Sequence, residues 1–145
     1  MANALATIGY EDATQADVIG RLKDAGVEIV IDVRAVPSSR RAGFSKNILA
    51  ASLHDAGIDY LHLKALGTPK PGRDAARKGH IDEMHAIYNH HLEEPQAQLQ
   101  LAEATEIANE RKAALLCYEA DVAGCHRRIV ADLIRDKTGL RVVDL

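Results

Sequence analysis

The stretch VEIVIDV at residues 27–33 decides the fold class of this chain. Its run of mostly β-branched residues is typical of a strand that is buried on both faces within a parallel sheet. Parallel strands cannot be joined by a tight hairpin, because each connection must cross back over the sheet, usually as a helix. The stretch therefore predicts an α/β protein in which strands and helices alternate.

The rest of the chain has this alternation. Apolar runs predict four further strands, at residues 4–10, 58–63, 113–119 and 140–145. A helix begins at Thr14, with Asp17 at the capping-box position and Gly26 as its stop. Other helical periods cover residues 45–56, 74–92, 95–112 and 125–137, and a Pro/Gly-rich loop precedes the second of these. Residues 1–145 are thus expected to form one three-layer α/β domain, with a mostly parallel sheet of about five strands and helices on both faces.

The composition limits the possible function classes. The chain carries 18 basic and 21 acidic residues, a net charge of −3, so no overall field favours DNA or an anionic membrane. No apolar run reaches the length of a membrane span, and the N-terminus lacks the features of a signal peptide. Two cysteines do not make a disulfide framework, so a reducing cytoplasm with free or functional thiols is expected. The exposed alanine-rich helices would allow a homodimer.

Ligands of open parallel sheets bind beyond the carboxyl ends of the strands. Four predicted strands end in polar or reactive positions: Gly9 and Tyr10, Asp32 and Arg34, His62 and Lys64, and Cys117 and Glu119. Parallel strands bring these ends to one edge of the sheet, where a cleft is therefore predicted.

The loops at this edge are basic, although the chain is acidic overall. Residues 34–46 and 64–79 contain nine arginines and lysines and a single acid. This local charge indicates a small ligand that bears phosphate or carboxylate groups. We expect the ligand to be bound by Arg34, Arg40, Ser38, Ser39 and His62.

The segment after the fourth strand carries both cysteines, a glutamate, a histidine and arginines. Cys117 ends the strand, and Cys125 is placed in the first turn of the next helix, where free N–H groups and the positive side chains of His126 and Arg127 would stabilise a thiolate. Three functional interpretations remain: a nucleophile with His126 or Glu119 as proton partner, a redox pair, or a metal site of both cysteines and His126. The spacing departs from common zinc patterns, so no metal ligand is assigned. In a fourth, the cysteines are simply buried small side chains.

These segments resemble the domain of unknown function 488 family. The residues that carry the resemblance are TIGY at 7–10, DVRAVPSSR at 32–40 with Phe44, GIDYLHLKALG at 57–67 and LLCYEADVAGCHR at 115–127. The resemblance covers nearly the whole chain and implies a compact α/β domain of bacterial or archaeal cytoplasm without an established activity. It marks as motif positions Asp32, Arg34, Arg40, Cys117, Glu119, Cys125, His126 and Arg127.

A weaker analogy is to rhodanese-type sulfurtransferases, which share the order of VIDVR, a strand ending in cysteine, a loop and a helix. There the cysteine carries a persulfide inside a loop of backbone N–H groups. Here Glu119 and Asp121 stand where such a cradle would need glycines and an arginine. Their carboxylates would repel an anionic sulfur donor, which argues against this reading.

The favoured hypothesis is a small cytoplasmic enzyme that acts on an anionic, nucleotide-like substrate. In it Arg127 and the loop arginines hold the anion, a cysteine supplies the thiolate, Glu119 or His126 moves protons, and Asp32 belongs to the same catalytic set. Nothing matches a phosphate loop or a dinucleotide fingerprint, so the cofactor, substrate and reaction stay unassigned.

Two other function classes stay open. A nucleic-acid-binding module would track phosphates with residues 34–46 and 64–79 and stack bases on Tyr10, Phe44 or Tyr118. The net negative charge and the shortage of aromatic residues argue against it. A sensor of metal or redox state would use the cysteine cluster without catalysis.

Overall fold

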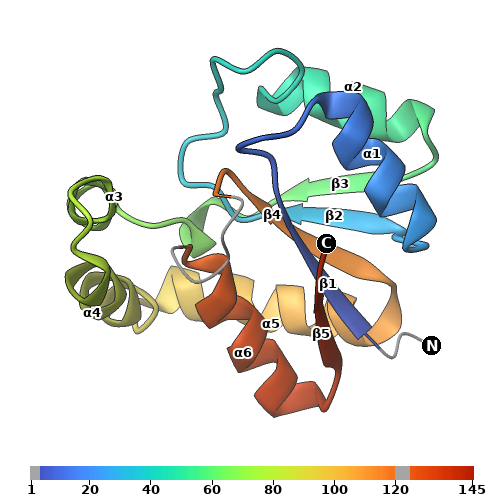
Figure 1. Ribbon diagram of the computed structural model, residues 1–145. Coiled ribbons are helices and arrows are strands. Elements are labelled where there is room, and N and C mark those ends of the chain that lie inside the picture. The colour runs from blue at the N-terminus through green and yellow to red at the C-terminus, as the bar shows by residue number, and fades with distance from the viewer. Residues whose placement is uncertain (1–3, 120–124) are drawn as a thin grey trace.

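The computed structural model describes residues 4–119 and 125–145, and its centre is a parallel five-stranded sheet (Figure 1). The strands lie in the order β3-β2-β4-β1-β5. Their bounds are Ala4–Gly9 for β1, Ile29–Asp32 for β2, Asp59–His62 for β3, Ala113–Cys117 for β4 and Arg141–Asp144 for β5. The α/β fold and the parallel sheet predicted from the sequence are confirmed.

Helices cover both faces of the sheet. Their bounds are Gln15–Asp24 for α1, Lys46–Asp55 for α2, Lys70–Arg77 for α3, Ile81–His91 for α4, Pro95–Glu110 for α5 and Arg127–Thr138 for α6, with a 3₁₀ turn at Lys64–Leu66. Strand residues alternate between the faces. Val30 packs with α1 and α2, whereas Ile29 and Ile31 pack with α4, α5 and α6. Two apolar cores therefore sandwich the sheet.

Two helix starts differ from the sequence prediction. The expected helix at 74–92 is two helices, because Gly79 has a φ of +79° and ends α3. Helix α3 also begins earlier than predicted, at Lys70, because Pro71 is tolerated in the first turn of a helix. Helix α6 begins at Arg127, so Cys125 lies just before the helix rather than in its first turn. The capping box of Thr14 and Asp17 on α1 is present as predicted.

The connections leave the sheet in a way that opens a crevice over the end of β4. The loops after β1 and β2 lead to α1 and α2 on one face, whereas the loop after β4 leads to α6 on the other. Strand β4 lies between β1 and β2, so neighbouring loops turn to opposite faces of the sheet at the end of β4. This divergence leaves a crevice beside Cys117. Within residues 4–119 and 125–145, no helix combines the length and the apolar character needed to cross a membrane.

Candidate active site

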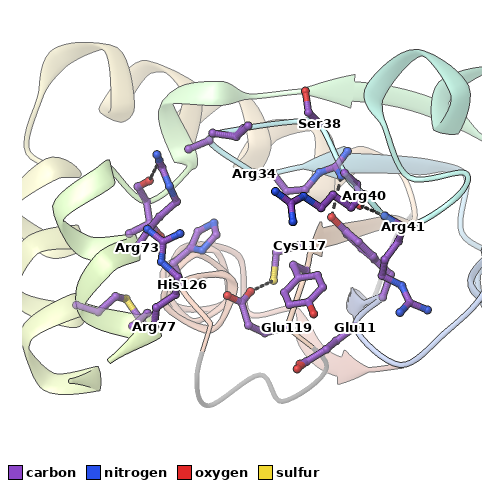
Figure 2. Close-up of a pocket in the computed structure, with 18 residues that line it drawn as sticks. Glu11, Arg34, Ser38, Arg40, Arg41, Arg73, Arg77, Cys117, Glu119 and His126 are labelled. Carbon is purple, nitrogen blue, oxygen red and sulfur yellow. Dashed lines mark hydrogen bonds between the residues drawn. The ribbon is translucent and has the colours of Figure 1, made fainter. Parts of the chain in front are cut away.

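A cavity of about 760 Å³ lies over the carboxyl end of β4 (Figure 2). Segments far apart in the chain form its wall: the end of β1, the loop after β2, helices α3 and α4, and the end of β4. Its polar and reactive lining consists of Tyr10, Glu11, Arg34, Ser38, Ser39, Arg40, Arg41, Thr68, Arg73, Arg77, Cys117, Tyr118, Glu119 and His126. Several residues predicted to gather at this edge of the sheet therefore share one cavity.

Cys117 lies between an acid and a cation. Its Sγ is 3.3 Å from Oε2 of Glu119, which is placed to accept the thiol proton when Cys117 is reduced. Nη1 of Arg127 donates to the same sulfur at 2.9 Å and also to the backbone carbonyl of Glu119. Arg127 is almost completely buried and lies beside the sulfur rather than in the cavity lining, where the sequence analysis expects it to bind an anion. A positive charge at this distance stabilises a thiolate.

Cys125 lies against Cys117, behind the cavity. The structure pairs the two cysteines as a disulfide, with their Cα atoms 7.6 Å apart. The backbone N–H of Arg127 donates to Sγ of Cys125 at 3.5 Å, and Nδ1 of His126 is 3.8 Å from that sulfur. Cys125 is buried and is not part of the cavity lining. The two cysteines thus share Arg127, and only Cys117 faces the cavity.

The burial of His126 and of Glu119 shifts their proton affinities in the direction of the neutral forms. Burial lowers the pKa of His126 to about 4, so its ring is neutral at physiological pH. Its Nε2 donates to the carbonyl of Val33 at 2.7 Å, which leaves the lone pair of Nδ1 directed at Cys125. Burial also raises the pKa of Glu119 above that of an ordinary glutamate, although the charge of Arg127 opposes this shift. Each sulfur therefore lies beside a different ionisable side chain, Glu119 for Cys117 and the neutral ring of His126 for Cys125.

Asp32 and Arg34 form a buried ion pair at the base of the loop after β2. Nε and Nη2 of Arg34 donate to the carboxylate of Asp32 at 2.7–3.1 Å, and Nη1 donates to the Tyr10 hydroxyl and the Phe44 carbonyl. Burial alone would lower the pKa of Arg34, but the hydrogen bonds and charge of Asp32 raise it above its ordinary value. Asp32 lies outside the cavity lining. Arg34 is part of the lining, but its guanidinium already donates to Asp32, Tyr10 and Phe44. This geometry is that of a pair that fixes a loop.

His62 also lies outside the cavity lining. Its Nε2 donates to the backbone carbonyl of Arg34 at 2.7 Å, so it supports the same loop from the end of β3. The Tyr60 hydroxyl, from the same strand, donates to Asp32. Tyr60 and His62 therefore support the ion pair from strand β3.

Arginines flank Cys117 on two sides. Arg40 and Arg41 come from the loop after β2, and Arg73 and Arg77 from α3, with Cys117 and Glu119 between the two groups in Figure 2. Ser38 and Ser39, which the sequence predicts to bind the ligand, line the cavity together with Arg40. Arg41, Arg73 and Arg77 are not among the site residues predicted from the sequence. Arg73 falls in the predicted loop and Arg77 in the predicted helix 74–92, so the sequence prediction does not show that their four-residue spacing places them on one face of α3.

Three potential metal ligands also meet here. Sγ of Cys117, a carboxylate oxygen of Glu119 and Sγ of Cys125 lie within 4.8 Å of one another. Thiolate and carboxylate are ligands that Zn²⁺ accepts. The set includes Glu119 in place of His126, the ligand considered from the sequence. Asp121, named above in the analogy to rhodanese-type sulfurtransferases, lies outside the described residues.

Comparison with known proteins identifies one relationship. A family model described as "Domain of unknown function DUF488" matches residues 14–134, which run from the cap of α1 into α6 and include both cysteines, Glu119 and the loop after β2. No curated protein and no solved structure matches the chain significantly.

Proposed function

We propose that this chain, which belongs to the DUF488 family, is a thiol enzyme that acts on an anionic substrate in the cavity over β4. One observation carries the proposal: the only cysteine in the lining, Cys117, has a carboxylate at 3.3 Å and a guanidinium at 2.9 Å from its sulfur. A nucleophilic cysteine needs both a group that takes its proton and a charge that stabilises the thiolate.

The roles of the neighbouring groups follow from their positions. Glu119 accepts the proton of Cys117 and returns it to the leaving group, and its raised pKa makes the carboxylate a stronger base for this transfer. Arg127 stabilises the thiolate. Arg40, Arg41, Arg73 and Arg77 attract the substrate anion and hold it next to the sulfur.

The test isolates Cys117 in a Cys125→Ser protein and follows alkylation by iodoacetamide across pH after reduction. We expect the alkylation rate to rise at a pH below about 8.5, where a free cysteine ionises. Glu119→Gln should slow the reaction near neutral pH without unfolding the chain, because the amide keeps the shape of the carboxyl but cannot take the proton.

The matched control is Cys117→Ser, in which Cys125 is the remaining thiol and should react more slowly because it is buried behind the cavity. If Cys117 reacts only at the alkaline pH of a free cysteine, or only in urea, the proposal is wrong. Inorganic pyrophosphate should protect Cys117 from alkylation if the arginines bind anions.

A metal site is the second candidate, supported by the close approach of Cys117, Glu119 and Cys125. The guanidinium of Arg127 beside Cys117 disfavours a cation there, so the thiol enzyme is preferred. Metal analysis of protein purified without a histidine tag separates the two. One zinc per chain that protects both cysteines from alkylation would support the metal site.

A further inference from the structure

We infer that Cys117 and Cys125 form a dithiol–disulfide couple that reduces a small anionic disulfide. The inference rests on the proposed function of Cys117 as nucleophile and adds the reaction class, the substrate class and the role of Cys125. It starts from the contact between the two sulfur atoms, which are within bonding distance.

The polar groups beside the two sulfur atoms distinguish a reactive pair of cysteines from a static bridge. Cys117 has Glu119 at 3.3 Å, and Cys125 has Nδ1 of His126 at 3.8 Å. Arg127 contacts both sulfurs, through Nη1 at 2.9 Å and through its backbone N–H at 3.5 Å. A bridge that only stabilises the fold needs none of these groups. A dithiol that must lose two protons and carry thiolate charge uses all of them.

The order of the two steps follows from access to the cavity. Cys117 lines the cavity, whereas Cys125 is buried behind it. A substrate disulfide can therefore reach Cys117 first, and Cys125 can reach only the sulfur of Cys117. Cys117 is the attacking thiol and Cys125 the resolving thiol.

The reaction balances without a cofactor. The Cys117 thiolate attacks one sulfur of the substrate disulfide, a Cys117–substrate bond forms, and the other half leaves as a thiolate that takes the proton held by Glu119. The Cys125 thiol then attacks Sγ of Cys117, and its proton passes to the second half of the substrate, which leaves as a thiol. Two electrons pass to the substrate, and a small external dithiol returns the pair to the reduced state.

The charge of the cavity selects the substrate class. Arg40, Arg41, Arg73 and Arg77 flank Cys117 on two sides, so a disulfide with an anionic group on each half can place its central bond over the sulfur. A cationic disulfide of similar length would meet repulsion on both sides.

The experiment uses the reduced full chain and glutathione disulfide, with mass spectrometry of acid-quenched samples. We expect the wild-type protein to form the Cys117–Cys125 bond and to release both halves of the probe as free thiol. Cys125→Ser should stop at the mixed disulfide on Cys117 and release only one half. Cystamine, a cationic disulfide, should react at least about tenfold more slowly than glutathione disulfide, and this difference in rate should shrink in high salt.

Two results would overturn the couple. Accumulation of a stable mixed disulfide in the wild-type protein would show that Cys125 does not resolve it, and a bridge that dithiothreitol reduces only after unfolding would be structural. If either occurs while Cys117 is still alkylated rapidly below pH 8.5, the proposed nucleophile stands and only the couple is lost. Equal rates with cystamine would overturn the anionic substrate class alone.

Discussion

His126 is a buried residue whose proton affinity links the site to the stability of the fold. The pKa of His126 falls to about 4 in the folded chain because burial removes the imidazolium from water, whereas an exposed histidine ionises near pH 6.5. Between these values the unfolded chain takes up a proton that the folded chain does not. We expect the contribution of His126 to the free energy of unfolding to be constant above pH 6.5 and to fall by about 3 kcal/mol as the pH drops to 4.

Urea unfolding of the wild-type protein and of His126→Gln at several pH values measures this contribution. Glutamine can still donate to the Val33 carbonyl but does not titrate, so the variant should lose less stability between pH 6.5 and 4. His54→Gln, on the exposed surface of α2, is the control and should follow the wild-type curve. Identical curves for all three would mean that the fold does not lower the pKa of His126.

The ion pair of Asp32 and Arg34 gives a second prediction for single residues. Asp32→Asn removes the charge that balances a buried guanidinium, and we expect it to lower the free energy of unfolding by about 3–5 kcal/mol. Asp74→Asn, in an exposed pair with Lys70 and Arg77, should lower the free energy of unfolding far less, because solvent screens exposed ion pairs. Chemical unfolding measures both. Similar small losses in the two variants would remove the structural role of the buried pair.

The sequence alone leaves Asp32 and Arg34 with two interpretations, a catalytic acid with an anion-binding arginine or a pair that fixes a loop. The contacts that favour the second come from Tyr10, Phe44 and Tyr60, which are distant in the chain. No local pattern encodes these contacts. The approach of the two sulfurs is likewise a product of the fold, because only the packing of α6 beside β4 brings Cys125 back to Cys117.

At the scale of elements, strand β1 passes so close to the end of β4 that only glycine fits at position 9. A Cβ on Gly9 would overlap the backbone carbonyl of Glu119 and approach Nη1 of Arg127 to 2.9 Å. Gly9→Ala must push the end of β4 aside. We expect a loss of about 1–3 kcal/mol in stability together with slower alkylation of Cys117.

Gly20→Ala is the matched control for Gly9→Ala. Gly20 lies within α1, and a Cβ there meets nothing within 4 Å. Alanine at this position should raise stability by about 0.4–1 kcal/mol and leave alkylation of Cys117 unchanged. Thermal unfolding and the alkylation rate distinguish the two variants. If Gly9→Ala alkylates at the wild-type rate, the contact between β1 and Glu119 does not position the site.

The elements themselves could be predicted from the sequence to different degrees. The five strands are recognisable because their apolar runs are short and bounded by polar or glycine residues. Helix α3 is not, since Pro69, Pro71 and Gly72 dominate its first turns and read as a loop. Proline is compatible with the start of a helix, where its missing N–H is not needed. Because this misreading leaves Arg73 in a loop and Arg77 in the next helix, it also hides that the two arginines lie on one face of α3.

At the scale of the whole molecule, charge is separated in space. The chain has a net charge of −3, yet five arginines and two glutamates line the cavity. The sequence predicts this basic rim from its loops, because loops at the carboxyl ends of parallel strands gather on one side. The local field in a cleft, rather than the net charge, determines which small molecules reach the thiol.

The last prediction compares two alkylating agents of similar size in the Cys125→Ser protein. Iodoacetate is an anion and iodoacetamide is neutral, so the arginines should raise the rate of the first relative to the second. The ratio of the two rates should fall as salt rises from about 0.01 M to 1 M, because the screening length shrinks from roughly 30 Å to 3 Å.

Arg40→Gln and Arg77→Gln, one from each side of the cavity, should each lower this ratio, whereas Arg21→Gln on the exposed surface of α1 removes the same charge and should not. Comparison at equal net charge separates a local field from a global one. A ratio that responds equally to all three variants would mean that the rim does not select anions. Because the substrate class proposed for the dithiol couple depends on that selection, the couple would then have to act on neutral disulfides as readily as on anionic ones.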